Sequence, residues 1–483
     1  MNKKIFLWLH MHQPDYLEST TGNIILPWVR RHSLNGYYTV AKLLEQSNFK
    51  ANINFSGILL EQIQRYQKAQ KDVYQIYEEK EPSDLTESEI DFIIKRFNTP
   101  PSFRSERFES IKENYKATMK ISEQDILDLQ TIFKLSAFAP IDKEIIELRK
   151  KEKFYSKNDK KVVIELESKI INELFDLYSL LQKRNQIEIT FTPYHHPILP
   201  LLLDIKVAKE SKHDAIIPNM ETHFYEDAKL HTEESIKKIE EIFDITPTGC
   251  WPAEGSISDE TIKFLKSSGT SWLGSDEALV KPLGLRQGVY ELNGVKLFLR
   301  NHEVSDKIGF VYNKMKLKDA MTDLKNEVDK NGTLILILDG ENPWEYFDNY
   351  GVDFLKNLFN TFSEKDSLLG SEVDTATSII NKILPGSWID GYFDTWIGDE
   401  ETNTAWIELI DARSKINTKE SFNEICKSEA SDYFWWYSDF HKQSINFDFD
   451  TLFRGRLIEA YKKSNLEVPH YLYYPIKKFP LGG

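Results

Sequence analysis

The segment from Thr333 to Phe347, TLILILDGENPWEYF, joins five branched aliphatic residues to two acids, an amide and an indole. Such an apolar run predicts a buried strand, and Asp339 stands where that strand ends. Asp-Gly and Asn-Pro are turn dipeptides, so a plain turn is one interpretation. The other is that the strand holds the Asp339 carboxylate in a rigid, partly desolvated place where its protonation state can be tuned. The choice depends on a second acid.

A candidate second acid is Glu254, in the segment TGCWPAEGSISDE. It lies between a Trp-Pro turn and Gly255, and Ser258 can cap a helix that begins just after it. A carboxylate in a loop between a strand and a helix occupies the catalytic end of many α/β folds. Glu254 and Asp339 could then act from two sides of a substrate, one as nucleophile and one as proton donor. The alternative is that Glu254 only starts a helix, where the helix dipole favours an acid.

The first apolar run ends in HMHQP, with His10 and His12 on the same side of an extended strand. A His-x-His pair after a first strand can bind a metal, as in metal-dependent amidohydrolases. It can also donate hydrogen bonds to neutral hydroxyl groups, or simply be satisfied in the core. Against the metal, no isolated Lys or His at the later strand ends clearly completes a ligand set, although His196 and His302 are candidates.

Other polar and aromatic side chains follow predicted strands. Arg300 stands at a strand end in LFLRNHEVSDKIGF, where it can hold a catalytic carboxylate ionised or form an ordinary ion pair. Trp388 and Trp396 lie in SWIDGYFDTWIGDEETNTAW, a loop-like segment whose rings suit stacking on sugar faces. Trp406, at the end of the same segment, falls where a helix begins and is better explained as core.

Short apolar strands alternate with longer helical patterns, which predicts an α/β fold with a parallel sheet or barrel. The predicted strands are Lys4–His10, Ala51–Ser56, Ile187–Thr192, Gly269–Ser275, Val295–Arg300 and Thr333–Asp339. Residues 60–185 are charged and helical in pattern, so we expect a helical insertion there. From about residue 375 the chain lacks strand signals and is dense in aromatics, which predicts a helical C-terminal domain.

Composition excludes some classes of protein. The formal charge of −15 argues against a nucleic acid as the main partner, because phosphate binding needs a basic surface. Two distant cysteines form no metal motif or disulfide framework, which favours a reducing compartment. No apolar stretch reaches transmembrane length, and the run Ile5–Leu9 is too short for a signal peptide. We therefore expect a cytoplasmic protein with no membrane or nucleic-acid partner.

Five segments taken in order resemble the five sequence regions of glycoside hydrolase family 57. They are HMHQPDY, IEITFTPYHHPILPLL, CWPAEGSIS, ILDGENPWEYF and GSWIDGYFDTWIG. The sequence is most similar to the amylopullulanase-like and α-amylase-like members. That resemblance implies an incomplete (β/α)7 barrel over residues 1–374, with the helical insertion at about 60–185. It also implies a C-terminal helical domain over residues 375–483 that contributes to the substrate cleft.

The resemblance further implies a retaining mechanism on α-glucans, with Glu254 as nucleophile and Asp339 as general acid/base. Such a pair must be about 5–5.5 Å apart, and burial and the anionic Glu254 should raise the pKa of Asp339. The substrate-binding residues implied are His10, His12, His196, Trp251, Arg300, His302, Trp388 and Trp396. Asn301 departs from the family pattern, in which an acid often follows the arginine. No metal or organic cofactor is expected.

The expected reaction is hydrolysis of α-1,4 glucosidic bonds in an α-glucan or malto-oligosaccharide, with α-1,6 bonds as a second candidate linkage. A 4-α-glucanotransferase or a glucan branching enzyme would use the same two carboxylates. Outside this class, the alternatives are a metal-dependent amidohydrolase using His10 and His12, and a non-catalytic glucan-binding protein.

Overall fold

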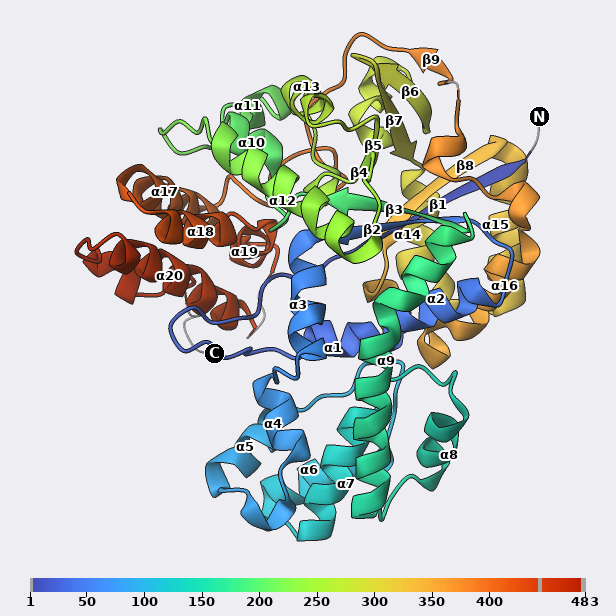
Figure 1. The fold of residues 1–483 in the computed structure, drawn as a ribbon, viewed down its shortest axis with the longest axis vertical. Coiled ribbons are helices and arrows are strands. Elements are labelled where there is room, and N and C mark those ends of the chain that lie inside the picture. Colours follow the sequence, from blue (N-terminus) through green and yellow to red (C-terminus); the bar gives the residue numbers. More distant parts are fainter. Residues whose placement is uncertain (1–2, 375, 442–444, 479–483) are drawn as a thin grey trace.

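A computed structural model describes residues 3–374, 376–441 and 445–478, and these form one nine-stranded sheet surrounded by helices (Figure 1). The strand order is β8-β1-β2-β3-β4-β5-β7-β6-β9. The strands are β1 (Lys4–Met11), β2 (Ala51–Ser56), β3 (Ile187–Thr192), β4 (Gly249–Cys250), β5 (Trp272–Asp276), β6 (Gly288–Leu292), β7 (Val295–Arg300), β8 (Thr333–Asp339) and β9 (Ser378–Ile379). Every neighbouring pair is parallel except β6 and β7. The predicted α/β class with a mostly parallel sheet is confirmed.

All six predicted strands are present, with ends that shift by up to three residues. The short strand β4 has no apolar pattern of its own. β6 pairs with β7 through a turn in which Asn293 and Gly294 both have positive φ, so the Asn-Gly dipeptide was a hairpin signal in the sequence. The expectation that no strand follows residue 375 is wrong, because Ser378 and Ile379 pair with β6. Both are exposed at the sheet edge, so they carry no burial pattern.

Most helices lie between strands or after the last long strand. They are α1 (Trp28–His32), α2 (Tyr38–Glu45), α3 (Gly57–Gln67), α4 (Val73–Glu79), α5 (Glu87–Arg96), α6 (Glu106–Thr118), α7 (Glu123–Leu135), α8 (Lys143–Lys151), α9 (Lys157–Lys183), α10 (Leu199–Leu203), α11 (Val207–Ser211), α12 (Tyr225–Phe243), α13 (Asp259–Ser267), α14 (His302–Phe310), α15 (Leu317–Asn331), α16 (Val352–Thr361), α17 (Glu400–Lys415), α18 (Lys419–Ser428), α19 (Ser431–Tyr437) and α20 (Asn446–Lys463). None of these helices combines the length and apolar composition needed to cross a bilayer.

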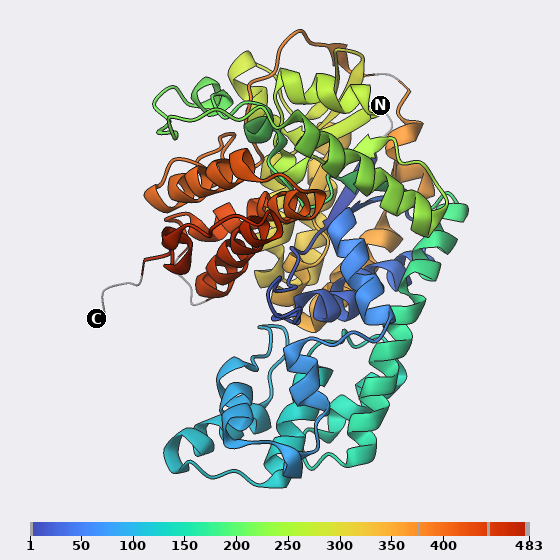
Figure 2. The same cartoon turned by 60° about the vertical axis from the view of Figure 1, so that its left-hand side comes forward.

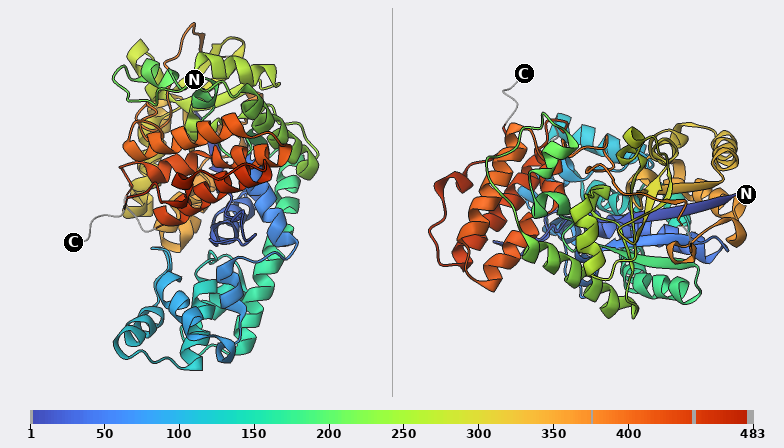
Figure 3. Two further views of the ribbon diagram at one scale, coloured as in Figure 1. Left: turned by 90° about the vertical axis from the view of Figure 1, so that its left-hand side faces the viewer. Right: turned by 90° about the horizontal axis from the view of Figure 1, so that it is seen from above.

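The helices α4 to α8, between β2 and β3, form a lobe below the sheet, and the long helix α9 runs from it back to β3 (Figures 1 and 2). Ser156 begins α9 with a capping box, because its side chain and that of Asp159 each bind the other's backbone N–H. The helices α17 to α20 gather on another side of the sheet (Figure 3). This packing brings residues from both ends of the sequence together, since the buried Arg456 donates a hydrogen bond to the Asp15 carbonyl at 2.6 Å.

The alternation of side chains along β1 determines what reaches the site. Ile5, Leu7 and Leu9 belong to the main core, whereas Phe6 and Trp8 belong to a second, aromatic cluster on the opposite face of the strand. Period-two geometry then puts the next residue on that side, His10, beyond Trp8 at the carboxyl end of β1. The aromatic cluster therefore packs beneath the polar side chains and forms the floor of the site.

Candidate active site

The polar residues at the carboxyl ends of β1 and β8 lie next to each other. His10 is the register partner of Asp339 in the parallel pairing of the two strands. Ile335, Ile337 and Asp339 follow the same alternation on β8 that Phe6, Trp8 and His10 follow on β1, and the two isoleucines share their aromatic cluster. Asn342 donates a hydrogen bond to Asp339 Oδ2 at 3.0 Å. Asp339 is therefore held at a strand end and faces the same side of the sheet as His10.

Glu254 follows β4 in a single turn of 3-10 helix with a left-handed backbone, φ 58°. A glutamate seldom adopts this conformation, and its surroundings hold it there. The Trp388 backbone N–H donates to the Glu254 carbonyl at 3.0 Å, and the Trp388 indole donates to Oε2 at 2.9 Å. Ser431 Oγ donates to Oε1 at 2.9 Å. Both carboxylate oxygens thus have a fixed donor, which orients the side chain.

Three histidine rings are stacked beside Glu254. The ring of His196 lies 3.8 Å from that of His12 and 5.0 Å from that of His10, and it is nearly parallel to both. His10 contacts Asn54 Oδ1 at 2.6 Å and His196 Nε2 at 3.0 Å. His196 Nδ1 contacts Ser431 Oγ at 2.8 Å and lies 3.8 Å from Glu254 Oε1. Burial and the neighbouring imidazoles lower the pKa of His10 to about 3 and that of His196 well below its usual range, so both are neutral hydrogen-bonding groups at pH 7.

The two acids have raised pKa values. Burial is the largest cause for Glu254, and the charges of Asp432 and Asp339 add to it, so its pKa rises to about 8 despite the donors from Ser431 and Trp388. Burial also raises the pKa of Asp339, while the charges of Arg300 and His12 oppose the rise. The expected rise for Asp339 is therefore present, with burial as its largest cause. The charge of Asp339 also contributes to the raised pKa of Glu254.

Glu341, two residues after Asp339, is a further buried acid. Its Oε1 accepts a hydrogen bond from Gln13 at 3.1 Å. Burial and the charge of Asp339 raise its pKa well above the usual value. A Cβ on Gly36 would lie 3.1 Å from the Glu341 Cβ, so the glycine leaves the space that this side chain fills. Glu341 is therefore a neutral acid beneath the site at pH 7.

Arg300 and His302 belong to an ion-pair group beside the site. Arg300 Nε binds Asp276 Oδ2 at 2.5 Å and Nη1 binds Asp306 at 3.0 Å, and the guanidinium lies 5.0 Å from the Trp388 ring centre. His302 contacts Asp276 at 2.9 Å. Asn301 accepts a hydrogen bond from the Val304 N–H and caps α14. Arg300 thus acts on Asp339 through its charge, and it orients the Trp388 ring.

The predicted tryptophans have different surroundings. Trp388 bonds to Glu254 and lies edge-on to Trp251 at 5.2 Å. Trp251 is fully buried and contacts Trp8 of the aromatic floor. Trp396 is also fully buried, packs against Trp435, and makes no contact with Glu254 or Asp339 among the described interactions. Trp406 is buried, as its assignment to the core predicts.

Sequence reasoning missed two residues of α19. Ser431 bonds to Glu254, and Asp432 Oδ2 lies 3.0 Å from His12 Nε2. Asp432 raises the pKa of both Glu254 and Asp339. The pair Ser-Asp at the start of a helix is an ordinary helix-start signal, and only the packing of α19 on the sheet brings it to the site.

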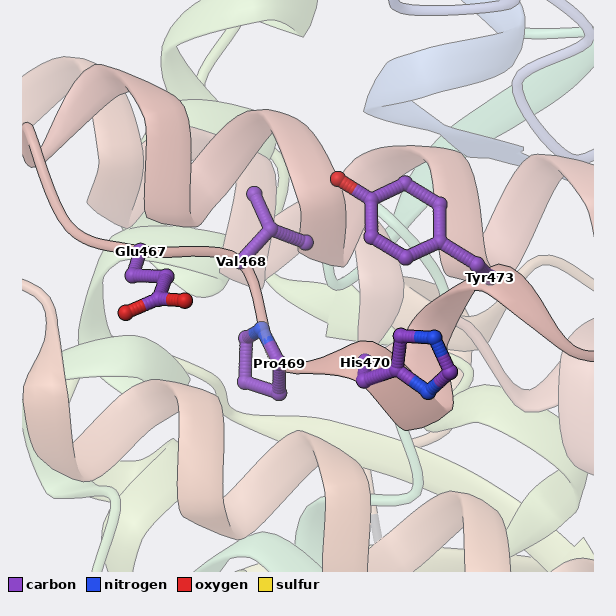
Figure 4. Close-up of a pocket in the computed structure, with 5 residues that line it drawn as sticks. All are labelled: Glu467, Val468, Pro469, His470 and Tyr473. Atoms are coloured by element: carbon purple, nitrogen blue, oxygen red, sulfur yellow. The ribbon is translucent and has the colours of Figure 1, made fainter.

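Two groups of described residues have the donors to hold a cation. One is His12, His196 and Asp432 in the site itself, where Asp432 completes the set that the sequence left open. The other is His231, Cys426 and Glu429, which lie outside it. A surface depression of about 490 Å³ after α20 is lined by neither group and by neither acid (Figure 4). Its lining residues are Glu467, Val468, Pro469, His470 and Tyr473.

Comparisons with known proteins bear on the family and the fold of the chain. The family model described as glycosyl hydrolase family 57 matches residues 6–385. A stretch of 201 residues is 25% identical to alpha-amylase 1 of Dictyoglomus thermophilum, and it spans 40% of this chain and 26% of that relative. The structure is similar to a branching enzyme from Pyrococcus horikoshii (TM-score 0.60, 15% identity, 100% of this chain and 98% of that chain). It is also similar to the alpha-amylase AmyC from Thermotoga maritima (TM-score 0.59, 13% identity, 98% and 96% of the two chains).

Proposed function

Because the chain belongs to glycosyl hydrolase family 57, we propose that it is a retaining glycosidase that hydrolyses α-1,4 glucosidic bonds in α-glucans, with α-1,6 bonds as a second candidate linkage. Family membership puts the chain among glycosidases, and the relative from Dictyoglomus thermophilum is named an alpha-amylase. The observation that carries the proposal is that two buried acids with raised pKa values, Glu254 and Asp339, stand at or just after the carboxyl ends of β4 and β8. Membership also supports the incomplete (β/α)7 barrel over residues 1–374 and a helical domain over 375–483.

Glu254 is the nucleophile in this proposal. Its carboxylate attacks the anomeric carbon and forms a glycosyl ester, while the C–O bond to the leaving sugar breaks. The active form has Glu254 ionised and Asp339 protonated, because the nucleophile must be a carboxylate and the proton donor an acid. The donors from Ser431 and Trp388 support the reaction, because they stabilise the ionised form of Glu254.

Asp339 is the general acid/base. It donates its proton to the glycosidic oxygen in the first half-reaction and removes a proton from water in the second, which regenerates the free Glu254 carboxylate. The neutral His10 and His196 rings, the His12 ring and the Trp388 ring bind the sugar hydroxyls and faces. The Arg300 guanidinium lies over the Trp388 ring and keeps that ring in position.

Transfer in place of hydrolysis is the second candidate. A 4-α-glucanotransferase or a branching enzyme needs the same two acids, and the solved relatives of similar fold include branching enzymes. The two reactions differ only in the acceptor that meets the glycosyl ester, which is water or a sugar hydroxyl.

The test is incubation with maltoheptaose and with amylose, followed by separation of the products. Hydrolysis gives shorter sugars only, disproportionation gives longer ones as well, and branching gives new α-1,6 links. Proton NMR in the first minutes should show the α-anomer as the initial product. Glu254→Gln serves as the control and should give no products. The β-anomer as first product would contradict the retaining mechanism, and turnover by Glu254→Gln would contradict the nucleophile.

A further inference from the structure

A second buried cluster lies behind the site, where α12 meets the segment after α18. His231 comes from α12, Cys426 from α18, and Glu429 follows α18 directly. All three side chains are at most 2% exposed. One nitrogen, one sulfur and one oxygen of the group lie within 4.8 Å of one another. The proposed reaction uses none of them.

The hydrogen bonding of this cluster is incomplete. Glu429 Oε2 contacts His231 Nε2 at 2.7 Å, but Oε1 has no hydrogen-bond donor among the described residues. The acidic neighbour is Asp227, whose two oxygens are already bound by Arg413 at 2.8 and 3.0 Å. Burial, the charge of Asp227 and a hydrogen bond with Asp227 raise the pKa of Glu429 well above its usual value. A carboxyl buried beside a second acid, with no Lys or Arg in contact among the described residues, is costly to ionise unless a cation joins it.

We propose that His231, Cys426 and Glu429 form a binding site for one divalent transition-metal ion, with zinc as the best match. Imidazole nitrogen, thiolate sulfur and carboxylate oxygen are the three ligand types that zinc takes in proteins. A water molecule or a rearranged Asp227 oxygen would fill the fourth position. Arg413 is paired with Asp227 and balances the charge of that carboxylate.

Charge favours this occupant. Cys426 is a free, buried thiol, and no Lys or Arg side chain forms an ion pair with Glu429 among the described residues. A thiolate and a carboxylate together balance the two charges of a divalent ion. To bind through Nε2, His231 would move its ring proton to Nδ1 and give up the 2.7 Å hydrogen bond to Glu429 and the 3.3 Å one from the His195 N–H in exchange for the bond to the metal.

A metal ion at this cluster would link the elements that hold Ser431 and Asp432 beside Glu254. The Tyr194 N–H donates to the His231 carbonyl at 2.8 Å, and the Ser431 N–H donates to the His196 carbonyl at 2.9 Å. Glu429 is two residues before Ser431 and three before Asp432. A metal ion here therefore fixes α12, the loop at residues 194–196 and the start of α19 relative to one another.

The test uses the full-length protein, freed of metal by a chelator, and titrated with Co²⁺ and separately with Zn²⁺. Cobalt should bind at one equivalent with the near-ultraviolet charge-transfer band of a Co–thiolate bond, and Zn²⁺ should displace it and raise the melting temperature. Cys426→Ser should lose the band, and Cys250→Ser, which replaces the other buried cysteine, should keep it.

The cluster in the active site contains no cysteine, so cobalt bound to His12, His196 and Asp432 would give no thiolate band. A band that survives in Cys426→Ser, or the absence of stoichiometric thiolate-bound cobalt in the unchanged protein, would overturn the proposal. The second result would mean that Glu429 and Asp227 share a proton instead. Neither readout depends on glucan turnover, so the proposed function can fail independently.

Discussion

Two buried groups of charged side chains in this protein contain acids whose pKa values shift in opposite directions. In the helical lobe, Arg30 binds Asp72, Glu78 and Glu167 at 2.8–2.9 Å, and Lys134 binds Glu78 and Glu167 at 2.9–3.0 Å. Burial works to raise the pKa of Glu78, but the two cations lower it to about 2. Glu78 is ionised because it has cations in contact.

The candidate site buries its acids without that compensation. The cation beside it, Arg300, forms its ion pairs with Asp276 and Asp306 and reaches Asp339 only through its longer-range charge. The pKa of Glu254 consequently rises to about 8. Burial is common to both groups, so the contacting cation decides whether a carboxyl is a fixed charge or a group that can exchange a proton.

The largest expected effect is the loss of turnover when Glu254, one of the acids of the candidate site, is replaced. Glu254→Gln should lower turnover of malto-oligosaccharides by on the order of 10⁴-fold, because an amide cannot form the glycosyl ester. Initial rates measure the loss, and circular dichroism checks that the variant is folded. Retention of a tenth of the activity would remove Glu254 from the chemistry.

In the compensated group, Arg30→Met should destabilise the fold by about 3–5 kcal/mol, because the buried Asp72 then loses its cation and Glu78 and Glu167 share Lys134 alone. Urea unfolding followed by fluorescence gives the free energy. The double variant Arg30→Met/Glu78→Gln should recover part of the loss, since it removes one of the unpaired charges. No recovery would indicate that Arg30 acts by packing and not by charge.

The stability of Glu254→Gln should depend on pH in a defined direction. The folded protein keeps the Glu254 proton up to about pH 8, whereas the unfolded chain releases it near the ordinary value of 4.5. The unfolded state therefore binds fewer protons between these values, and the stability of the unchanged protein falls as pH rises through this window. Melting curves should show the variant gaining a few degrees relative to the unchanged protein between pH 5 and pH 8. A constant difference across that range would show that the pKa of Glu254 is not raised.

Replacing Asp432, the acid that sequence reasoning missed, should shift the pH profile of kcat/KM. Asp432 raises the pKa of both Glu254 and Asp339, so Asp432→Asn should shift both limbs of the pH profile of kcat/KM to lower pH by about one unit. Asp394→Asn, which removes a surface acid paired with Lys212, is the matched control and should leave the profile in place. Equal profiles for the two variants would exclude an electrostatic role for Asp432.

The smallest expected effect is that of Ser431→Ala. Loss of the donor to Glu254 Oε1 destabilises its ionised form, so the acid limb should move to higher pH by roughly half a unit. Ser428→Ala removes a nearby buried hydroxyl that bonds only to a backbone carbonyl, and it should not move the limb. A shift to lower pH would mean that Ser431 does not donate to the carboxylate.

The sequence predicted well the features that local pattern determines. The long strands are visible because buried strands require unbroken apolar runs, and Asp339 is visible because it ends one of them. β4 has only two residues, and its place in the sheet follows from its neighbours β3 and β5. Ser431 and Asp432 resemble any helix start, and no local pattern shows that α19 packs beside Glu254. Tertiary packing supplied what the sequence could not.

The pairing of β1 with β8 also determines the order in which the sheet can form during synthesis on the ribosome. β1 can pair with β2 as soon as both have emerged, but its other edge stays open until residues 333–339 follow. The nascent chain therefore carries an unsatisfied strand edge until β8 has emerged, which invites misassociation and makes assembly slow. Since α19 follows β8 in the sequence, Ser431 and Asp432 can reach Glu254 only after β8 is available for pairing.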